Sequence, residues 1–295
     1  MGSVDKLKVG DSIGIFSPST PITYSCPKRF KRGIKYLQDK GFKIILGKLT
    51  EKHDFYRSGT IKERAEELND LIRNPEVRCI MSTIGGMNSN SLLPYIDYEA
   101  FQRDPKMIIG YSDVTAILLA IYAQTGISTY YGPALVASFG ELPPFVDDTY
   151  QYFAEIVMDN PMTPYVFETP EYWTDEYINW ETQDRSKEKR ENQWLRVYDG
   201  VVRGRVIGGN LDTIQGIWGS KYMPQIKKGD LLFIEDSLKD CAIIERSFSL
   251  LKVNGVFDQI SGIILGKHEL FDDLKTGRRP YEILVEVLGD QKLPF

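Results

Sequence analysis

The segment "KMIIGYSDVTAILLA", Lys106 to Ala120, decides the fold. A strand-like run, Met107 to Ile109, stops at Gly110-Tyr111-Ser112-Asp113, and a helix-like run from Val114 to Ala123 begins at once. A strand that passes directly into a helix is typical of parallel sheets covered by helices. Ser112 lies in this turn and permits two interpretations. It is either a nucleophile held clear of the backbone, or a residue that, like Asp113, caps the helix.

The rest of the first half repeats this alternation of strands and helices. Thr60 with Glu63 three residues later forms a capping box, and Gly41 ends an earlier helical pattern. Ligands in such sheets collect beyond the carboxyl ends of the strands, so we expect a site at the turns that follow the later strands. The predicted strands, with their turns, are "SIGIF" (12–16), "KIIL" (43–46), "RCIMSTIGG" (78–86) and "KMIIGYSD" (106–113).

Length and composition narrow the class of protein. At 295 residues the chain exceeds what one hydrophobic core usually organises, so we expect more than one domain. A formal charge of −5 offers no basic surface to nucleic acid, and no apolar run is long enough for a signal peptide or a membrane span. We therefore expect a cytoplasmic protein without nucleic-acid or membrane partners. Three separated cysteines and two histidines suggest neither a disulfide framework nor a metal site.

The texture of the sequence changes near Glu141, and we divide the chain into residues 1–150, a linker with a loop at 151–200, and a second domain at 201–295. Short strands, a helix and many glycines make that second domain mixed α and β. In the linker, Glu181 to Glu191 carries four acids and four bases and reads as a solvated loop. Its flanking tryptophans, Trp173, Trp180 and Trp194, permit another interpretation, a loop that closes over a ligand.

Two further turns leave alternatives open. The glycines of "STIGGMNSNS" either form a plain turn or let the backbone approach a ligand closely. They do not match Gly-x-Gly-x-x-Gly, so no dinucleotide cofactor is indicated, and we expect none of any kind. Glu235-Asp236 closes the apolar run "LLFI". A carboxylate there either caps a helix, lies on the surface, or orients an imidazole.

Seven separated motifs, in order over nearly the whole chain, resemble the serine carboxypeptidase family of LD-carboxypeptidases and microcin C immunity proteins. They are "SPSTP", "STIGGMNSNSLLPYID", "IGYSDVTA", "YYGPALV", "VIGGNLDTIQGIWGS", "GDLLFIEDS" and "SGIILGKHE". The tryptophan-bearing segment "EYINWETQ" looks like the immunity branch. That branch hydrolyses the amide between an aspartyl residue and a modified nucleotide, which gives antibiotic resistance. The resemblance implies a flavodoxin-like N-terminal domain, a mixed α/β C-terminal domain and a homodimer.

The resemblance also implies roles for individual residues. Ser112 matches the nucleophile and Glu235 the acidic member of a Ser-Glu-His triad, while Gly86 and Asp113 match the oxyanion-hole N–H groups. The matched substrate contacts are Gly85, Trp180 on the adenine, and Asp212, Lys239 and Glu269 on the aminoacyl part. Asp212 stands where the family pattern has an asparagine, so we expect altered recognition.

The expected histidine has no match. In the family it lies in an Asp-x-x-His-Thr-His-like motif beyond the point that matches Phe295, so we interpret the sequence as C-terminally truncated. His268 follows a strand-like run, "GIILG", and is not the family's base; His53 lies in a charged loop. We therefore expect substrate binding with little or no catalysis. The alternatives are a carboxypeptidase acting on murein tetrapeptide and a non-catalytic aminoacyl-nucleotide binding protein.

Overall fold

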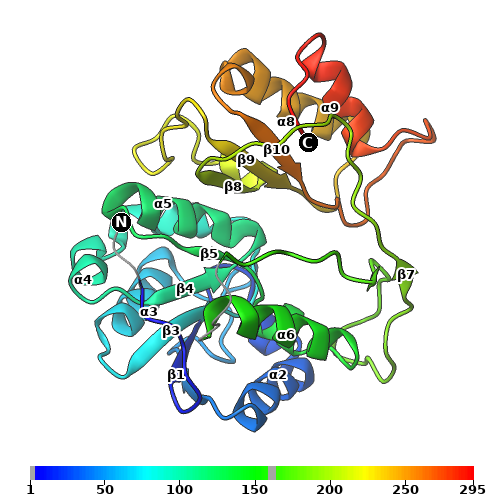
Figure 1. Ribbon diagram of the computed structural model, residues 1–295. Coiled ribbons are helices and arrows are strands. Elements are labelled where there is room, and N and C mark those ends of the chain that lie inside the picture. The colour runs from blue at the N-terminus through cyan, green and yellow to red at the C-terminus, as the bar shows by residue number, and fades with distance from the viewer. Residues whose placement is uncertain (1–3, 159–163) are drawn as a thin grey trace.

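The computed structural model describes residues 4–158 and 164–295, and its N-terminal half is a parallel sheet (Figure 1). All neighbouring strands run parallel in the order β2-β1-β3-β4-β5. Their bounds are Ser12–Phe16 (β1), Lys43–Leu46 (β2), Val77–Ser82 (β3), Met107–Gly110 (β4) and Tyr130–Tyr131 (β5). The four strands predicted from the sequence are confirmed.

Helices cover both faces of this sheet. Because side chains alternate along a strand, Ile80 and Ile108 enter one core cluster, while Met81 and Ile109 enter the other. The first cluster is covered by α3 and α5, and the second by α2 and α6. The helices of this half are Ile22–Ser25 (α1), Pro27–Asp39 (α2), Ile61–Arg73 (α3), Tyr98–Arg103 (α4), Thr115–Thr125 (α5) and Phe145–Val157 (α6).

The local helix signals behave as the sequence predicts. The Thr60 side chain accepts a hydrogen bond from the Glu63 N–H, and the Glu63 carboxylate accepts one from the Thr60 N–H, so the capping box of α3 is present. Gly41 follows α2 with φ +92°, a conformation that favours glycine. Short helical turns complete the connections at Ser89–Tyr95 (η1), Ser112–Val114 (η2), Leu135–Phe139 (η3) and Val256–Asp258 (η4).

The C-terminal half is a smaller parallel sheet, in the order β10-β9-β8. Its strands are Val206–Asn210 (β8), Leu231–Glu235 (β9) and Gly262–Leu265 (β10), and its helices are Leu211–Gln215 (α7), Cys241–Val253 (α8) and Pro280–Leu288 (α9). Helix α5 lies between the two sheets in Figure 1, and its core cluster continues into residues of β8 and β9. The two sheets therefore share one apolar core, which fixes them against each other.

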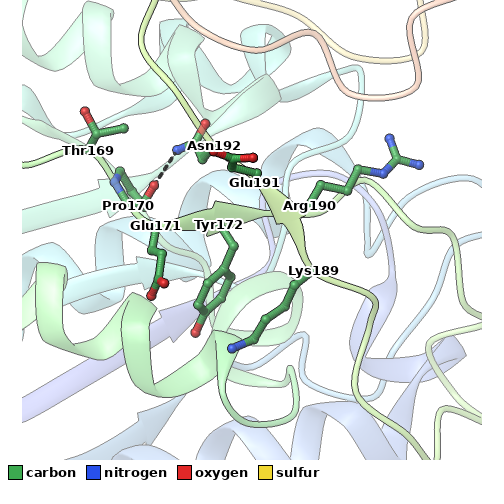
Figure 2. Close-up of a pocket in the computed structure, with 8 residues that line it drawn as sticks. All are labelled: Thr169, Pro170, Glu171, Tyr172, Lys189, Arg190, Glu191 and Asn192. Atoms are coloured by element: carbon green, nitrogen blue, oxygen red, sulfur yellow. Dashed lines mark hydrogen bonds between the residues drawn. The ribbon is translucent and has the colours of Figure 1, made fainter.

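The connection between the halves carries a two-stranded antiparallel ribbon, Tyr172–Trp173 (β6) with Arg190–Glu191 (β7). Figure 2 shows the Lys189 and Tyr172 side chains on one side of it, and the Lys189 ammonium lies 3.7 Å from the centre of the Tyr172 ring. The ribbon and its flanks line an open hollow of about 530 Å³.

Among the described residues, no helix combines the length and the apolarity needed to cross a bilayer.

The prediction that residues 181–191 are a solvated loop is wrong at one position. Gln183 is buried, and its side chain accepts a hydrogen bond from Arg29 and donates one to Glu141. A polar side chain can be buried when its donors and acceptors are satisfied, and α2 and the segment after η3 supply those partners. Hydrophobic periodicity carries no signal for such a contact.

Candidate active site

The turn between β4 and α5 holds Ser112 in a left-handed conformation, with φ +59°. Neither Ser112 nor Asp113 caps the helix that follows, because Tyr111 is the N-cap of η2, Val114 is the N-cap of α5, and no side chain caps either element. The capping interpretation is therefore wrong. A non-glycine residue in this region costs about 1–2 kcal/mol, and strain of this kind clusters at functional sites. The Ser112 hydroxyl makes no hydrogen bond to any part of the chain that the structure describes.

The glycine turn after β3 packs directly against Ser112. A Cβ added to Gly85 would lie 3.1 Å from the Ser112 Oγ and 3.0 Å from the Asp113 nitrogen, so only glycine lets the two turns approach this closely. Gly86 has φ +147°, and a Cβ there would lie 2.2 Å from the Ser19 Oγ. Within residues 4–158 and 164–295, the N–H groups of Gly86 and Asp113 have no hydrogen-bond acceptor. Two unused donors thus flank the free hydroxyl.

The Asp113 carboxylate ties the two turns together. It is buried and accepts hydrogen bonds from the N–H groups of Asn88, at 3.0 Å, and Ser89, at 2.9 Å. The Ser89 hydroxyl in turn donates to the Asp113 carbonyl. Asp113 therefore has a structural carboxylate and a free backbone donor.

Glu235 approaches the same turn from the other half of the chain, at the end of β9. Its Oε1 accepts a hydrogen bond of 2.5 Å from the Tyr131 hydroxyl, which itself accepts one of 2.9 Å from the Ser112 N–H. The Asn210 amide donates to Glu235 at 3.1 Å and to Asp236 at 3.3 Å. Glu235 and Ser112 are thus joined through one tyrosine hydroxyl, although 123 positions separate them (235 − 112).

Burial raises the pKa of Glu235, and the nearby carboxylates of Asp236 and Glu269 raise it further, while the hydrogen bonds from Tyr131 and Asn210 lower it. Asp236 is 1% exposed, and burial raises its pKa as well, against hydrogen bonds from the Ser237 N–H and the Asn210 amide. The donors are what keep these adjacent carboxylates ionisable in a desolvated position.

The matched aminoacyl contacts lie close to this acidic pair. The Lys239 ammonium contacts the Asp212 carboxylate at 2.7 Å, and the Asp212 N–H donates to Asp236 at 3.1 Å. The backbone of Glu269 pairs with the segment after β9, where the Leu238 N–H donates to the Glu269 carbonyl at 2.8 Å. The structure therefore brings Asp212, Lys239 and Glu269 to the Glu235 end of the site.

Trp180 lies against the N-terminal half, with the Arg29 guanidinium carbon 4.3 Å from the centre of its ring. Arg29 donates to the Val136 carbonyl, and the Val136 N–H donates to the Thr83 carbonyl, two residues before Gly85. One face of the indole is thus covered by a cation, and this chain of contacts connects it to the glycine turn.

Neither histidine makes a hydrogen bond or a ring contact with the Ser112 turn or with Glu235 in the described chain. His53 is exposed and lies against Tyr24, with ring centres 4.0 Å apart. His268 lies near the rings of Phe248 and Phe271, with its Nδ1 3.2 Å from the Gly266 carbonyl. Its Nε2 is buried without a partner among the described residues. The expectation that neither is the base stays a prediction.

The His268 environment predicts a pH-dependent stability. Burial lowers the pKa of His268 to about 4, below the ordinary value of 6.5, so the unfolded chain takes up this proton at a higher pH than the folded protein. Stability should fall as the pH drops from about 6.5 to 4, by on the order of 2 kcal/mol from this residue. Urea unfolding of wild type and His268→Phe at pH 7 and 4.5 measures it. The variant should lose less stability than wild type, and His53→Gln should behave as wild type; equal losses in all three would refute the prediction.

No group of three or more His, Cys, Asp or Glu side chains able to hold a metal ion occurs in the chain as far as it is described. The polar groups of the candidate site are instead the Ser112 hydroxyl, the Glu235 and Asp236 carboxylates, the Asn210 amide and the Tyr131 hydroxyl between them. These groups suit proton transfer and acyl chemistry.

Sequence reasoning missed three residues of this arrangement. Tyr131 and Asn210 fall inside the quoted motifs "YYGPALV" and "VIGGNLDTIQGIWGS", each at the carboxyl end of a strand. That position was the available signal, since neighbouring parallel strands end at the same edge. Arg29 left no signal, because its partners lie more than 100 positions away.

The chain is similar to known proteins over nearly its whole length. Its sequence matches the LD-carboxypeptidase N-terminal domain over residues 13–132 and the LD-carboxypeptidase C-terminal domain over residues 203–295. The microcin C7 self-immunity protein MccF of Escherichia coli is 58% identical over 290 residues, which are 98% of this chain and 84% of that protein.

Solved structures agree with the sequence match. MccF in complex with aspartyl sulfamoyl adenosine has a TM-score of 0.96 and 56% identity, covering 100% of this chain and 88% of that one. An MccF-like protein from Bacillus anthracis has a TM-score of 0.86 and 28% identity, with the same coverage. The mixed α/β fold implied by the motifs is confirmed, and the chain belongs to the LD-carboxypeptidase family of peptidases.

Proposed function

We propose that this protein is a serine hydrolase of the immunity type, which cleaves the amide between an aminoacyl group and a nucleotide and so protects against microcin C-type compounds. The observation that carries the proposal is the free Ser112 hydroxyl between two unused backbone donors, linked through Tyr131 to Glu235. Structures of MccF in complex with aspartyl sulfamoyl adenosine and with glutamyl sulfamoyl guanosine support the substrate class.

In the proposed reaction, a base removes the Ser112 proton while the Ser112 Oγ attacks the scissile carbonyl carbon. The N–H groups of Gly86 and Asp113 donate to the oxyanion that forms. The protonated base then gives its proton to the leaving nitrogen as the C–N bond breaks. In the second half, the base removes a proton from water while the water oxygen attacks the acyl carbon, and the base returns that proton to the Ser112 Oγ as the acyl group leaves. Glu235 orients the base and stabilises its cation.

We propose that the base is a histidine that this sequence does not contain. The partners of His53 and His268 support this, since within the described chain neither imidazole makes a hydrogen bond to Ser112 or Glu235. Removing one member of such a triad can cost on the order of 10⁶ in turnover, so the 295-residue chain should bind its substrate and hydrolyse it extremely slowly.

For recognition, we propose that Trp180 stacks on the nucleobase. Its ring is held by Arg29, whose guanidinium carbon lies 4.3 Å from the ring centre, and an indole fixed in this way can stack on a planar group. Asp212, Lys239, Glu269 and the Gly85 turn would contact the aminoacyl part. The ion pair between Lys239 and Asp212 supports an altered preference, because an acidic side chain of the substrate would have to compete with Asp212 for the lysine.

The proposal is tested by comparing this chain with the same chain extended by a C-terminal tail that carries the Asp-x-x-His-Thr-His-like motif of the family. Aspartyl sulfamoyl adenosine and a murein tetrapeptide are offered to both forms. The extended form should hydrolyse the nucleotide and leave the peptide intact. A folded, extended form that is inert on every aminoacyl nucleotide would contradict the proposal, and preference for the tetrapeptide would support the murein alternative.

A binding protein without chemistry is the other alternative, and turnover by the extended form separates it from the first. Both proposals expect nucleotide binding that Trp180→Ala weakens, by about tenfold for the loss of one stacked aromatic contact. Only the hydrolase proposal expects turnover in the extended form. We further propose a cytoplasmic homodimer, on the strength of the family resemblance; light scattering at several protein concentrations tests the dimer.

A further inference from the structure

Tyr131 is the one side chain that forms hydrogen bonds with both Ser112 and Glu235 among the described residues. It lies at the end of β5, in the lower half of Figure 1, whereas Glu235 ends β9 in the upper half. Its hydroxyl uses its single proton for Glu235, at 2.5 Å, and a lone pair for the Ser112 N–H, at 2.9 Å. No motif match assigns this residue a role.

We propose that Tyr131 is a positioning residue that holds the nucleophile turn and the acidic triad member in one geometry across the two halves of the chain. The inference rests on the proposed function, since it takes Ser112 as nucleophile and Glu235 as the acid. It adds a residue whose own atoms take no part in bond making.

The hydrogen bond from the Ser112 N–H to Tyr131 determines which backbone N–H groups remain available to the substrate. A residue with φ +59° keeps that strained conformation only when its surroundings determine it, and the bond from its N–H to Tyr131 is one such constraint. Because the Ser112 N–H is occupied, the donors beside the hydroxyl that have no acceptor within the described chain are those of Gly86 and Asp113.

The hydrogen bond from the Tyr131 hydroxyl to Glu235 favours the ionised form of Glu235. Glu235 is faced by Tyr131 of β5, Asn210 of β8, Asp236 after β9 and Glu269 beyond β10. The two carboxylates and burial favour the protonated form of Glu235, and the two donors favour the ionised form that can orient an imidazole. Removing the stronger and shorter of the two hydrogen bonds should therefore make Glu235 titrate at a higher pH.

The ring of Tyr131 is held independently of its hydroxyl. It packs edge to face against Phe233, with centroids 5.1 Å apart, and lines a cavity of about 440 Å³ between α5, β8 and β9. Tyr131→Phe should therefore keep the fold and lose only the two hydrogen bonds. Tyr130→Phe is the matched control, because Tyr130 is the preceding residue of the same strand and its hydroxyl makes no hydrogen bond within the described chain.

Two measurements test the inference. The first is a carbon NMR titration of the Glu235 carboxyl in this chain, assigned by its disappearance in Glu235→Gln. The second is hydrolysis of aspartyl sulfamoyl adenosine by the extended form. Tyr131→Phe should raise the Glu235 midpoint by about one pH unit and lower kcat by about 10- to 100-fold, with KM within twofold. Tyr130→Phe should change neither quantity.

The outcomes separate this inference from the proposed function. If Tyr131→Phe leaves the Glu235 midpoint unchanged, the inference is overturned, because a purely structural tyrosine would not alter the titration. This holds if kcat is unchanged and also if kcat falls together with the melting temperature. If the extended wild type does not hydrolyse the nucleotide, the proposed function fails. The titration of Glu235 still decides the role of Tyr131 in that case.

Discussion

Replacing Ser112 by alanine in the extended, histidine-bearing form is expected to lower the turnover of aspartyl sulfamoyl adenosine by on the order of 10⁶. The reason is chemical: the Ser112 hydroxyl lies beside the free donors of Gly86 and Asp113, and without it the oxyanion contacts can act only on direct attack by water. Steady-state release of the nucleoside product measures the effect. Calorimetry should show that the alanine variant binds the substrate as tightly as wild type.

A second variant at the same position separates chemistry from folding. Ser112 has φ +59°, which glycine adopts without the cost that a Cβ imposes, so Ser112→Gly should raise the free energy of unfolding by about 1 kcal/mol. It should be as inactive as Ser112→Ala. An enzyme that becomes more stable when its nucleophile is removed is storing strain at that residue. Substantial residual turnover in both variants would show that Ser112 is not the nucleophile.

Replacing Arg29 by methionine is expected to lower the free energy of unfolding by about 3–5 kcal/mol, the largest stability effect we predict. Arg29 is 1% exposed and donates to the carbonyls of Val136 and Ala137, to Gln183, and to the Glu141 carboxylate at 2.9 Å. Methionine fills much of the volume but cannot donate, so the Val136 and Ala137 carbonyls lose this hydrogen bond. The buried Glu141 carboxylate loses the Arg29 cation, although Leu142 and Gln183 still donate to it. Chemical denaturation of this chain at neutral pH measures the change.

The neighbouring residue supplies the control for Arg29. Lys28 precedes it in α2, but its side chain is 76% exposed and lies 3.9 Å from Glu181, so Lys28→Met should cost less than about 0.5 kcal/mol. Arg29→Lys should lie between the two, since it keeps the charge and loses the planar fork. A loss of under 1 kcal/mol for Arg29→Met would contradict the prediction.

Arg29 also connects stability to recognition. Its guanidinium lies over Trp180 and binds Gln183, so it fixes both ends of the short segment that carries the proposed nucleobase contact. Loss of Arg29 should therefore weaken nucleotide binding even under conditions where the variant is folded. The Trp180 segment is thus ordered by a buried polar contact, which its own composition does not suggest.

Much of the N-terminal fold could be predicted because its signals are local. The alternation of apolar runs, the Thr60 capping box and Gly41 each depend on residues within a few positions of one another, and each is present in the structure. The position of Ser112 between a strand and a helix was equally local. Its conformation and its free hydroxyl were not, because both depend on the Gly85 turn and on Tyr131.

The sequence by itself determined the parallel sheet with helices on both faces, the strand-to-helix turn at Ser112, and, through its ordered motifs, the family. Only the tertiary structure decided that Ser112 does not cap the following helix, that Tyr131 joins it to Glu235, and that Arg29 donates a hydrogen bond to a buried Gln183. The physical reason is how far apart in the sequence the interacting residues lie. Helices and strands follow from periodicity over a few residues, whereas each of these contacts joins side chains whose partners are chosen by packing between distant segments.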